Sequence, residues 1–227
     1  MSTALTSAER KQARMFNYAD APIMNDRTYN LTIGGVVLYG VIINALMCYY
    51  LAPLIMAINP LVLIIGYFAL AIAGSVITYK SDSPLISFLG YNMVAVPLGA
   101  VLTVCVQGYS SAIVFQAFLL TAVITAVMLL LATAFPAVFA GMGRMLFAAL
   151  IGSLLAGIVC MIFSFTTIIL SWVIAVIFAL YIGYDWVKAQ QYVHTLDNAV
   201  DSALDIYMDI INLFLNLLRI FGKSSDS

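Results

Sequence analysis

The chain of 227 residues is 64% hydrophobic and only 8% charged, so it lacks the polar side chains that would coat a soluble domain of this size. This composition predicts an integral membrane protein that crosses the lipid bilayer several times. The net charge of −1 provides no basic surface to neutralise phosphates, which excludes nucleic acid as a partner.

The sequence contains no recognisable motif of a catalytic or cofactor-binding site. Cys48, Cys105 and Cys160 lie far apart in apolar runs, without the paired spacing or the neighbouring histidines of a metal or redox centre. We therefore expect them to be buried thiols. The nucleophile motif GxSxG and the zinc motif HExxH are both absent from the sequence. We expect a protein that is not an enzyme and that needs no cofactor.

Residues 1–30 are polar and carry several acidic and basic side chains. No short apolar core follows the basic residues, so the segment lacks the pattern of a cleaved signal peptide. We predict a polar cytoplasmic segment at residues 1–30, a single transmembrane domain at 31–222 and a short polar tail at 223–227.

From residue 31 onwards the apolar runs are about 20 residues long, which is enough for a helix to cross about 30 Å of hydrocarbon. Proline and small polar residues separate most of the runs, and Pro97 should kink the third helix. The boundary between the fifth and sixth runs is marked only by Ser164-Phe165-Thr166-Thr167. The sequence therefore predicts an all-α fold with seven transmembrane helices. They lie near residues 31–51, 60–79, 84–106, 112–134, 145–165, 167–187 and 203–222.

The distribution of Lys and Arg predicts the orientation in the membrane, because cytoplasmic loops are enriched in these residues. With the N-terminus inside, seven of the nine basic residues fall on the cytoplasmic side, and Arg219 and Lys223 fall outside. We therefore expect a multi-pass protein of the cell (inner) membrane with a cytoplasmic N-terminus and an external C-terminus. The cytoplasmic basic residues would be Arg10, Lys11, Arg14, Arg27, Lys80, Arg144 and Lys188.

The last predicted helix combines an apolar surface with one polar stripe. Aspartates recur along it at four-residue spacing from Asp197, and further polar residues follow. At about 100° per residue, six of these groups fall within an arc of about 80°. Such a helix should sit inside a bundle, with its stripe facing protein or water rather than lipid. The six residues of the stripe are Asp201, Asp205, Asp209, Asn212, Asn216 and Arg219.

Two carboxyl groups are expected to meet near the cytoplasmic mouth of the bundle. Asp185 is the only acidic residue of the sixth predicted helix, and it shares a face with Tyr181 and Lys188. If the last two helices are antiparallel neighbours, Asp209 lies at a comparable depth. Like charges a few ångströms apart cannot both ionise cheaply, so the pair would share one proton. The alternative is a structural role, in which each carboxylate pairs with a basic side chain or a backbone donor.

The other titratable groups near the last helix are expected to be less important. Asp197 and Asp201 fall in or near the preceding loop, and we expect them on a solvated face. For Asp205 the pattern favours neither a structural nor a functional role. His194 lies in the same loop and is expected at the surface.

The C-terminal part of the chain resembles a known family. The Tyr-Asp pair near the end of the sixth predicted helix is followed by Asp-Ile-Tyr-Met-Asp-Ile-Ile-Asn-Leu-Phe-Leu-Asn-Leu-Leu-Arg-Ile-Phe-Gly at residues 205–222. This pattern closely resembles the Bax inhibitor-1 family, also called the transmembrane Bax inhibitor motif family, and the chain looks like a bacterial member. The specific match covers residues 181–222, and the seven-helix layout extends it loosely over the rest.

The resemblance implies a central seventh helix wrapped by the other six and a pH-sensitive calcium leak across the membrane. It also implies a di-aspartyl sensor from the sixth and seventh helices, which by motif is Asp185 and Asp209. Family members have a basic residue near the end of the second helix that can compete for the sixth-helix aspartate. Lys80 is the residue available for this role, and Lys188 is a nearer competitor.

The sequence and the resemblance together predict a pH-sensitive calcium leak channel, with the lipid bilayer, calcium ions and protons as its partners. Carboxylate oxygens suit a hard cation such as Ca²⁺, so Asp185 and Asp209 would also form a weak, transient calcium site. The alternative is a regulatory membrane protein that binds a membrane protease or another integral partner, with a structural aspartate stripe. Possible auxiliary positions along the ion path or latch are Asp205, Asp201, Lys80, Lys188, Asn212, Asn216 and Arg219.

Overall fold

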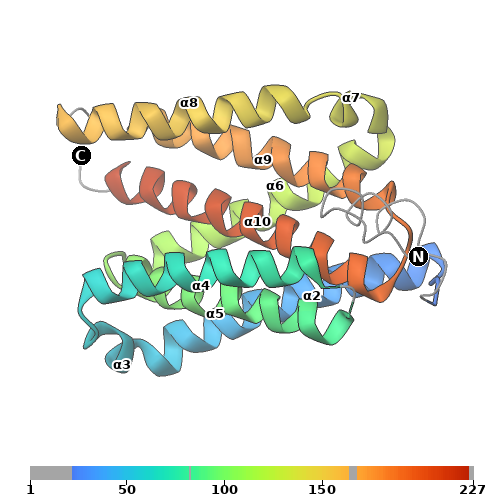
Figure 1. Ribbon diagram of the computed structural model, residues 1–227. Helices are drawn as coiled ribbons and strands as arrows, with labels where there is room; N and C mark the ends of the chain where they lie inside the picture. Colours follow the sequence, from blue (N-terminus) through green and yellow to red (C-terminus); the bar gives the residue numbers. More distant parts are fainter. Residues whose placement is uncertain (1–21, 82, 164–167, 225–227) are drawn as a thin grey trace. The chain divides into compact units, whose positions relative to one another are not determined.

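The computed structural model describes residues 22–81, 83–163 and 168–224, which form helices joined by short connections (Figure 1). No strand occurs within these ranges, in agreement with the predicted all-α fold. The helical elements are α2 (Asp26–Leu46), a π-helical turn (Met47–Leu51), α3 (Ala52–Met56), α4 (Pro60–Lys80), α5 (Pro84–Gln107), α6 (Ser111–Ala134), α7 (Pro136–Ala140), α8 (Gly143–Ile162), α9 (Ile168–Gln190) and α10 (Leu196–Ser224).

Six helical segments of the described chain are long and apolar enough to cross a membrane. They are the segment Asp26–Met56, which runs from α2 through α3, and the helices α4, α5, α6, α8 and α9. Their positions agree with the first six predicted spans to within a few residues, which confirms the membrane-protein class. The predicted boundary at residues 164–167 lies outside the described residues.

The first helix begins earlier than the sequence indicated, at Asp26 rather than near residue 31. Asn25 caps this helix, because its side-chain oxygen accepts a hydrogen bond of 2.8 Å from the backbone N–H of Thr28. The negative charge of Asp26 in the first turn is also favourable beside the positive end of the helix dipole. Residues 26–30 are polar and nevertheless helical, so the predicted N-terminal segment overlaps α2.

α10 differs from these six segments because it is charged and buried at the same time. It has 29 residues and is therefore about 43 Å long. Among its described side chains, only Leu196, Arg219 and Lys223 are exposed. By contrast, the most apolar stretches of α4 and α8 are only 11% buried. α10 is therefore an interior helix, as its polar stripe predicted, whereas α4 and α8 present most of their surface to the exterior.

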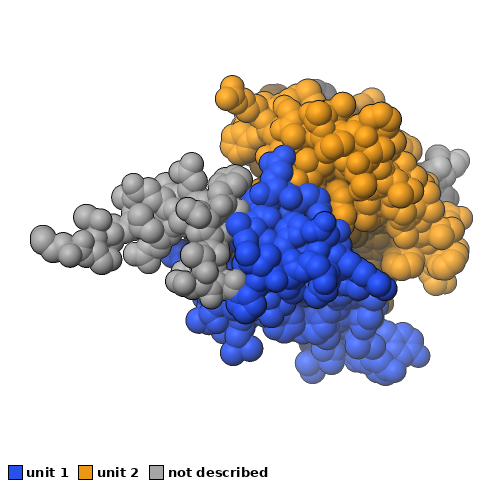
Figure 2. All heavy atoms as spheres, turned by 90° about the vertical axis from the view of Figure 1, so that its right-hand side faces the viewer, with its two compact units in different colours: residues 1–104, 189–205 blue, residues 105–188, 206–227 orange. Residues whose placement is uncertain are grey.

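The chain divides into two compact units, which Figure 2 colours separately. Unit 1 comprises residues 1–104 and 189–205, and unit 2 comprises residues 105–188 and 206–227. Unit 1 thus contains α2 to α4, most of α5 and the first turns of α10. Unit 2 contains α6 to α8, most of α9 and the remainder of α10.

Within unit 1, α4 and α5 pack with their backbones in contact at a pair of glycines. A Cβ atom placed on Gly90 would lie 2.7 Å from the carbonyl oxygen of Gly74 and would collide with the side-chain oxygen of Thr78. A Cβ atom placed on Gly74 would lie 2.6 Å from the carbonyl oxygen of Gly90. Small residues at such a crossing allow helices to approach closely in a membrane.

Candidate functional site

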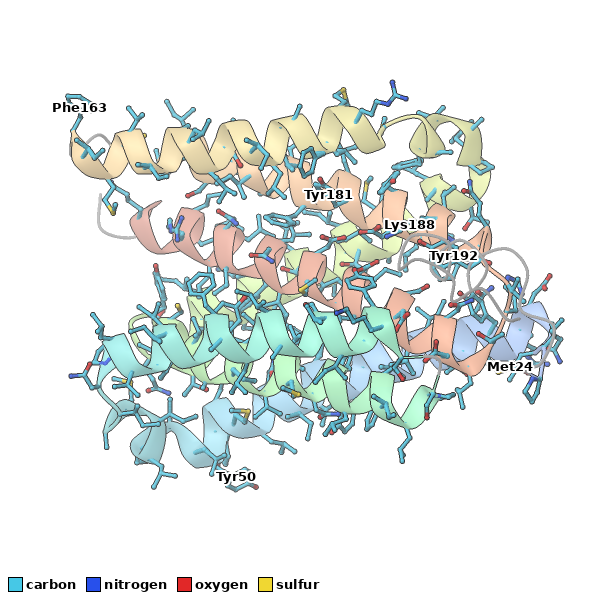
Figure 3. All side chains as sticks on the ribbon, viewed as in Figure 1. Met24, Tyr50, Phe163, Tyr181, Lys188 and Tyr192 are labelled. Carbon is cyan, nitrogen blue, oxygen red and sulfur yellow. The ribbon has the colours of Figure 1, made fainter. Side chains whose placement is uncertain are left out.

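Asp185 lies on α9 in unit 2, between two residues that share its face of the helix. Its Oδ1 atom is 3.3 Å from Nζ of Lys188, one turn further along the helix. Tyr181 lies one turn before it, and Figure 3 labels Tyr181 and Lys188 on α9. Asp185 is 9% exposed. The i, i+3 pair that the sequence predicted is therefore formed, and it is largely buried.

Asp209 lies on α10, also within unit 2, and it is 7% exposed. Tyr181, Asp185 and Lys188 also belong to unit 2. Unit 2 therefore contains both aspartates of the predicted pair, each of them buried, while their direct contact stays a prediction.

The part of α9 that carries Asp185 is held tightly by other elements of unit 2. Gly183 faces the ring of Phe139 on α7 so closely that a Cβ atom would collide with it. A Cβ atom placed on Gly143, at the start of α8, would lie 2.7 Å from the hydroxyl of Tyr184. Trp186 donates a hydrogen bond of 3.1 Å from its ring nitrogen to the hydroxyl of Thr133 on α6.

The residues on both sides of Asp185 are therefore fixed to three other helices of unit 2. Such support keeps a side chain in one orientation. Nothing in the sequence indicated these contacts, because the residues involved are far apart in the chain.

Asp205 and Lys80 belong to unit 1. The hydroxyl of Tyr79 donates a hydrogen bond of 2.8 Å to Oδ1 of Asp205, which is half-buried on α10. Lys80 is the last residue of α4 and is exposed. Lys188, one of the two basic residues considered as competitors for Asp185, forms an ion pair with it.

The expectation that Asp197 and Asp201 lie on a solvated face is wrong. Asp197 is 5% exposed and Asp201 is 9% exposed. The hydroxyl of Ser87 on α5 donates a short hydrogen bond of 2.6 Å to Oδ1 of Asp197. α10 begins at Leu196, so Asp197 lies in its first turn, where the helix dipole also favours a negative charge. The polar residues around Asp197 in the sequence suggested a loop, whereas its partner Ser87 lies on α5, which is far away in the sequence but in contact with it.

His194 is also less exposed than predicted, with 17% of its side chain accessible. Its ring stacks on Tyr29 of α2, with ring centroids 4.2 Å apart and an interplanar angle of 9°. Its Nδ1 atom is 3.2 Å from Oδ1 of Asp26, which is itself 89% exposed. His194 therefore lies in the loop, as predicted, and its ring is partly covered by Tyr29 of α2.

The C-terminal part of the stripe is built from amide side chains. Asn212 donates a hydrogen bond of 2.8 Å from its side-chain nitrogen to the backbone oxygen of Met208, and Asn216 donates one of 2.8 Å to the backbone oxygen of Asn212. Asn216 is 7% exposed, whereas Arg219 is exposed. The stripe therefore remains polar beyond Asp209, with both amides bonded to the backbone of α10.

No group of three or more His, Cys, Asp and Glu side chains that could hold a metal ion occurs within residues 22–81, 83–163 and 168–224. Stable calcium sites use six to eight oxygen ligands. Asp185 and Asp209 could contribute only two carboxyl groups, which suits a brief encounter with a cation rather than tight binding.

Comparison with known proteins identifies the family. The family model described as "Inhibitor of apoptosis-promoting Bax1" matches residues 23–226. The chain belongs to the Bax inhibitor-1 family. The match extends the resemblance seen at residues 181–222 over almost the whole chain, and it confirms the predicted family.

Similar bacterial proteins include membrane proteins. The inner membrane protein YbhL of Escherichia coli K12 is 28% identical over 218 residues, which cover 87% of this chain and 92% of YbhL. A membrane protein of Streptococcus pyogenes serotype M1 is 29% identical over 195 residues, with 82% of this chain and 80% of the relative covered. A protein of Helicobacter pylori strain J99 is 28% identical over 151 residues, or 66% of this chain and 59% of the relative. These relatives and the six apolar helices support a membrane location, while the orientation of the N-terminus stays a prediction.

Proposed function

We propose that this member of the Bax inhibitor-1 family is a pH-sensitive calcium leak channel, gated by a proton that Asp185 and Asp209 share. The observation that supports this proposal best is that α9 and α10 each bury one carboxyl group within unit 2, Asp185 and Asp209. Buried acidic residues in a membrane protein are costly and typically mark ion or proton pathways.

In the proposed mechanism, the shared proton joins the two carboxyl groups and holds α9 against α10. Loss of that proton leaves two like charges in a poorly hydrated place, which favours their separation. Lys188, already 3.3 Å from Asp185, then stabilises the separated state by pairing with its carboxylate. Rising pH therefore opens the path, and the released carboxylate oxygens offer calcium a weak site as it passes.

The test is calcium flux into liposomes that contain only this protein, measured from about pH 6 to about pH 8, where a perturbed carboxyl group at a functional site commonly titrates. Wild-type flux should rise across this range. Asp185→Asn and Asp209→Asn should each flatten the profile, because asparagine keeps hydrogen bonding but cannot titrate. The double variant should add little, because the two residues act as one unit.

Asp26→Asn is the matched control, since it removes one carboxylate from a position that is 89% exposed, and it should leave the profile unchanged. Additive effects of the two Asn replacements would indicate two separate sites rather than one pair. A wild-type protein without calcium flux would refute the channel. That result would favour the alternative of a regulatory membrane protein whose aspartates hold the helices together, as Asp197 does through Ser87.

A further inference from the structure

Tyr29, on the second turn of α2, contacts both helices that flank the α9–α10 connection, and all of these contacts lie within unit 1. Its hydroxyl donates a hydrogen bond of 3.1 Å to the backbone oxygen of Ala189, near the end of α9. The same hydroxyl is 3.4 Å from the hydroxyl of Ser202 on α10. Tyr29 is completely buried, so water does not compete for these bonds.

The connection itself is also fixed to the start of α2. The ring of His194 stacks on the ring of Tyr29, and the backbone N–H of Met24 donates a hydrogen bond of 2.8 Å to the backbone oxygen of His194. The side chain of Gln190 donates a hydrogen bond of 2.9 Å to the side-chain oxygen of Asn30. The segment from the end of α9 to the start of α10 is thus bonded to α2 at several points.

The contacts of Tyr29 can affect the aspartate pair because each contact and one of the aspartates lie on the same helix, either α9 or α10. Ala189 follows Asp185 by one turn of α9, and Ser202 precedes Asp209 by two turns of α10. A helix behaves as a rigid element over such short lengths. Fixing Ala189 and Ser202 to one hydroxyl therefore restricts how far the two helices can separate at their connection.

We propose that Tyr29 is a positioning residue for the Asp185/Asp209 pair, acting through its hydroxyl bonds to Ala189 and Ser202. The inference rests on the proposed function, and it adds a residue of α2 to those that control the aspartate pair. Breaking these bonds allows α9 and α10 to separate more easily, so the protein leaks calcium even while the pair holds its proton. His194 is a titratable group that faces Tyr29, and Asp26 lies beyond it.

The test compares Tyr29→Phe with Tyr39→Phe in the full-length protein in liposomes. Both changes remove one hydroxyl from α2, and Tyr39 donates a hydrogen bond of 2.8 Å to Asn92 on α5, away from the α9–α10 connection. We expect Tyr29→Phe to raise calcium flux at about pH 6 roughly fivefold, the factor that corresponds to one lost hydrogen bond. The ratio of flux at high pH to flux at low pH should fall by the same factor, and Tyr39→Phe should keep the wild-type ratio.

A second readout does not depend on calcium. Amide hydrogen exchange, followed by mass spectrometry, should be faster in residues 189–202 of Tyr29→Phe than of wild type, because this segment loses its attachment to α2. The Tyr39→Phe protein should exchange at the wild-type rate there. Ser202→Ala removes one partner without changing Tyr29 and should give the same result to a smaller extent, so the inference can be tested even if Tyr29→Phe does not fold.

The ring of His194 stacks on the ring of Tyr29, so His194→Phe separates the contribution of His194 from that of the hydroxyl. This variant keeps a ring against Tyr29 and should retain most of the pH dependence. A wild-type exchange pattern and flux ratio in Tyr29→Phe would overturn the inference. Equal effects of Tyr29→Phe and Tyr39→Phe would also overturn it, since they would mean general loosening. Absence of flux from the wild-type protein would instead refute the channel, and hydrogen exchange would still decide the role of Tyr29.

Discussion

Replacing Gly90 by alanine should destabilise the protein, because α4 and α5 touch at this position. The new Cβ atom would lie 2.7 Å from the backbone oxygen of Gly74 and 3.0 Å from the backbone nitrogen of Thr78, whereas ordinary contacts begin at 3.4 Å. The new Cβ atom would also collide with the hydroxyl of Thr78, which donates a hydrogen bond to the backbone oxygen of Ser87. Two of these obstacles are backbone atoms, so the helices themselves must move apart.

The expected magnitude follows from two opposing terms. Overpacking of this kind costs about 1–3 kcal/mol, while alanine gains up to about 1 kcal/mol of helix propensity over glycine. Because two of the obstacles are backbone atoms, the cost should lie at the upper end of its range, and the net loss in the free energy of unfolding is roughly 2 kcal/mol. For a chain of this length, such a loss lowers the melting temperature by about 4–8 °C.

Thermal unfolding in detergent provides the assay, and Gly66→Ala is the matched control. Gly66 lies on α4, the helix that Gly90 of α5 contacts, and a Cβ atom placed on it would meet no neighbouring atom within 4 Å, so only the helix-propensity gain remains. Gly66→Ala should melt at or above the wild-type temperature, and Gly90→Ala below it. If the two variants melt together, the close approach of α4 and α5 is not a feature of the folded protein.

Three further predictions concern stability and topology. Asp209→Lys should be less stable than Asp209→Leu by roughly 3 kcal/mol in detergent, because an uncompensated buried charge is costly, and equal melting temperatures would mean that Asp209 faces open water. Ser87→Ala should lose about 1.5–3 kcal/mol with its hydrogen bond to Asp197; Ser153→Ala, which loses only a bond within its own helix, should cost less, and the reverse order would contradict the assignment. Reporter fusions should place residue 1 in the cytoplasm and residue 227 outside, and a C-terminal reporter active in the cytoplasm would exclude seven crossings.

The positions of the helices could be predicted because their signals are local. Apolar runs of bilayer length, separated by proline and small polar residues, identify helices without knowledge of their neighbours. The pairing of Asp185 with Lys188 was predictable for the same reason, since the i, i+3 spacing alone places the two side chains together. The role predicted for Asp209, as one half of the aspartate pair, came from the family pattern at residues 205–222.

The contacts that surround these residues could not be predicted, because each joins distant parts of the chain. Asp197 is polar and follows a loop, and nothing near it in the sequence indicates that Ser87 will bury it. Tyr29 is one tyrosine among 13, and its bonds to Ala189 and Ser202 depend on the folded arrangement of unit 1. Gly90 could not be distinguished from Gly66 without the partner helix.

The burial of α10 has a consequence for how the protein is made. Each aspartate raises the free energy of inserting an isolated helix into lipid. The translocon should therefore insert α10 into the bilayer less readily than the six apolar segments. α10 also follows those segments in the chain, and is therefore synthesised after them. It can enter when a preassembled bundle offers polar partners such as Ser87 and Tyr79, which makes its insertion a late assembly step rather than an independent one. Replacing Ser87 or Tyr79 would then reduce the amount of protein in the membrane, because the chain fails to assemble and is degraded. This loss would be seen before any change in transport could be measured.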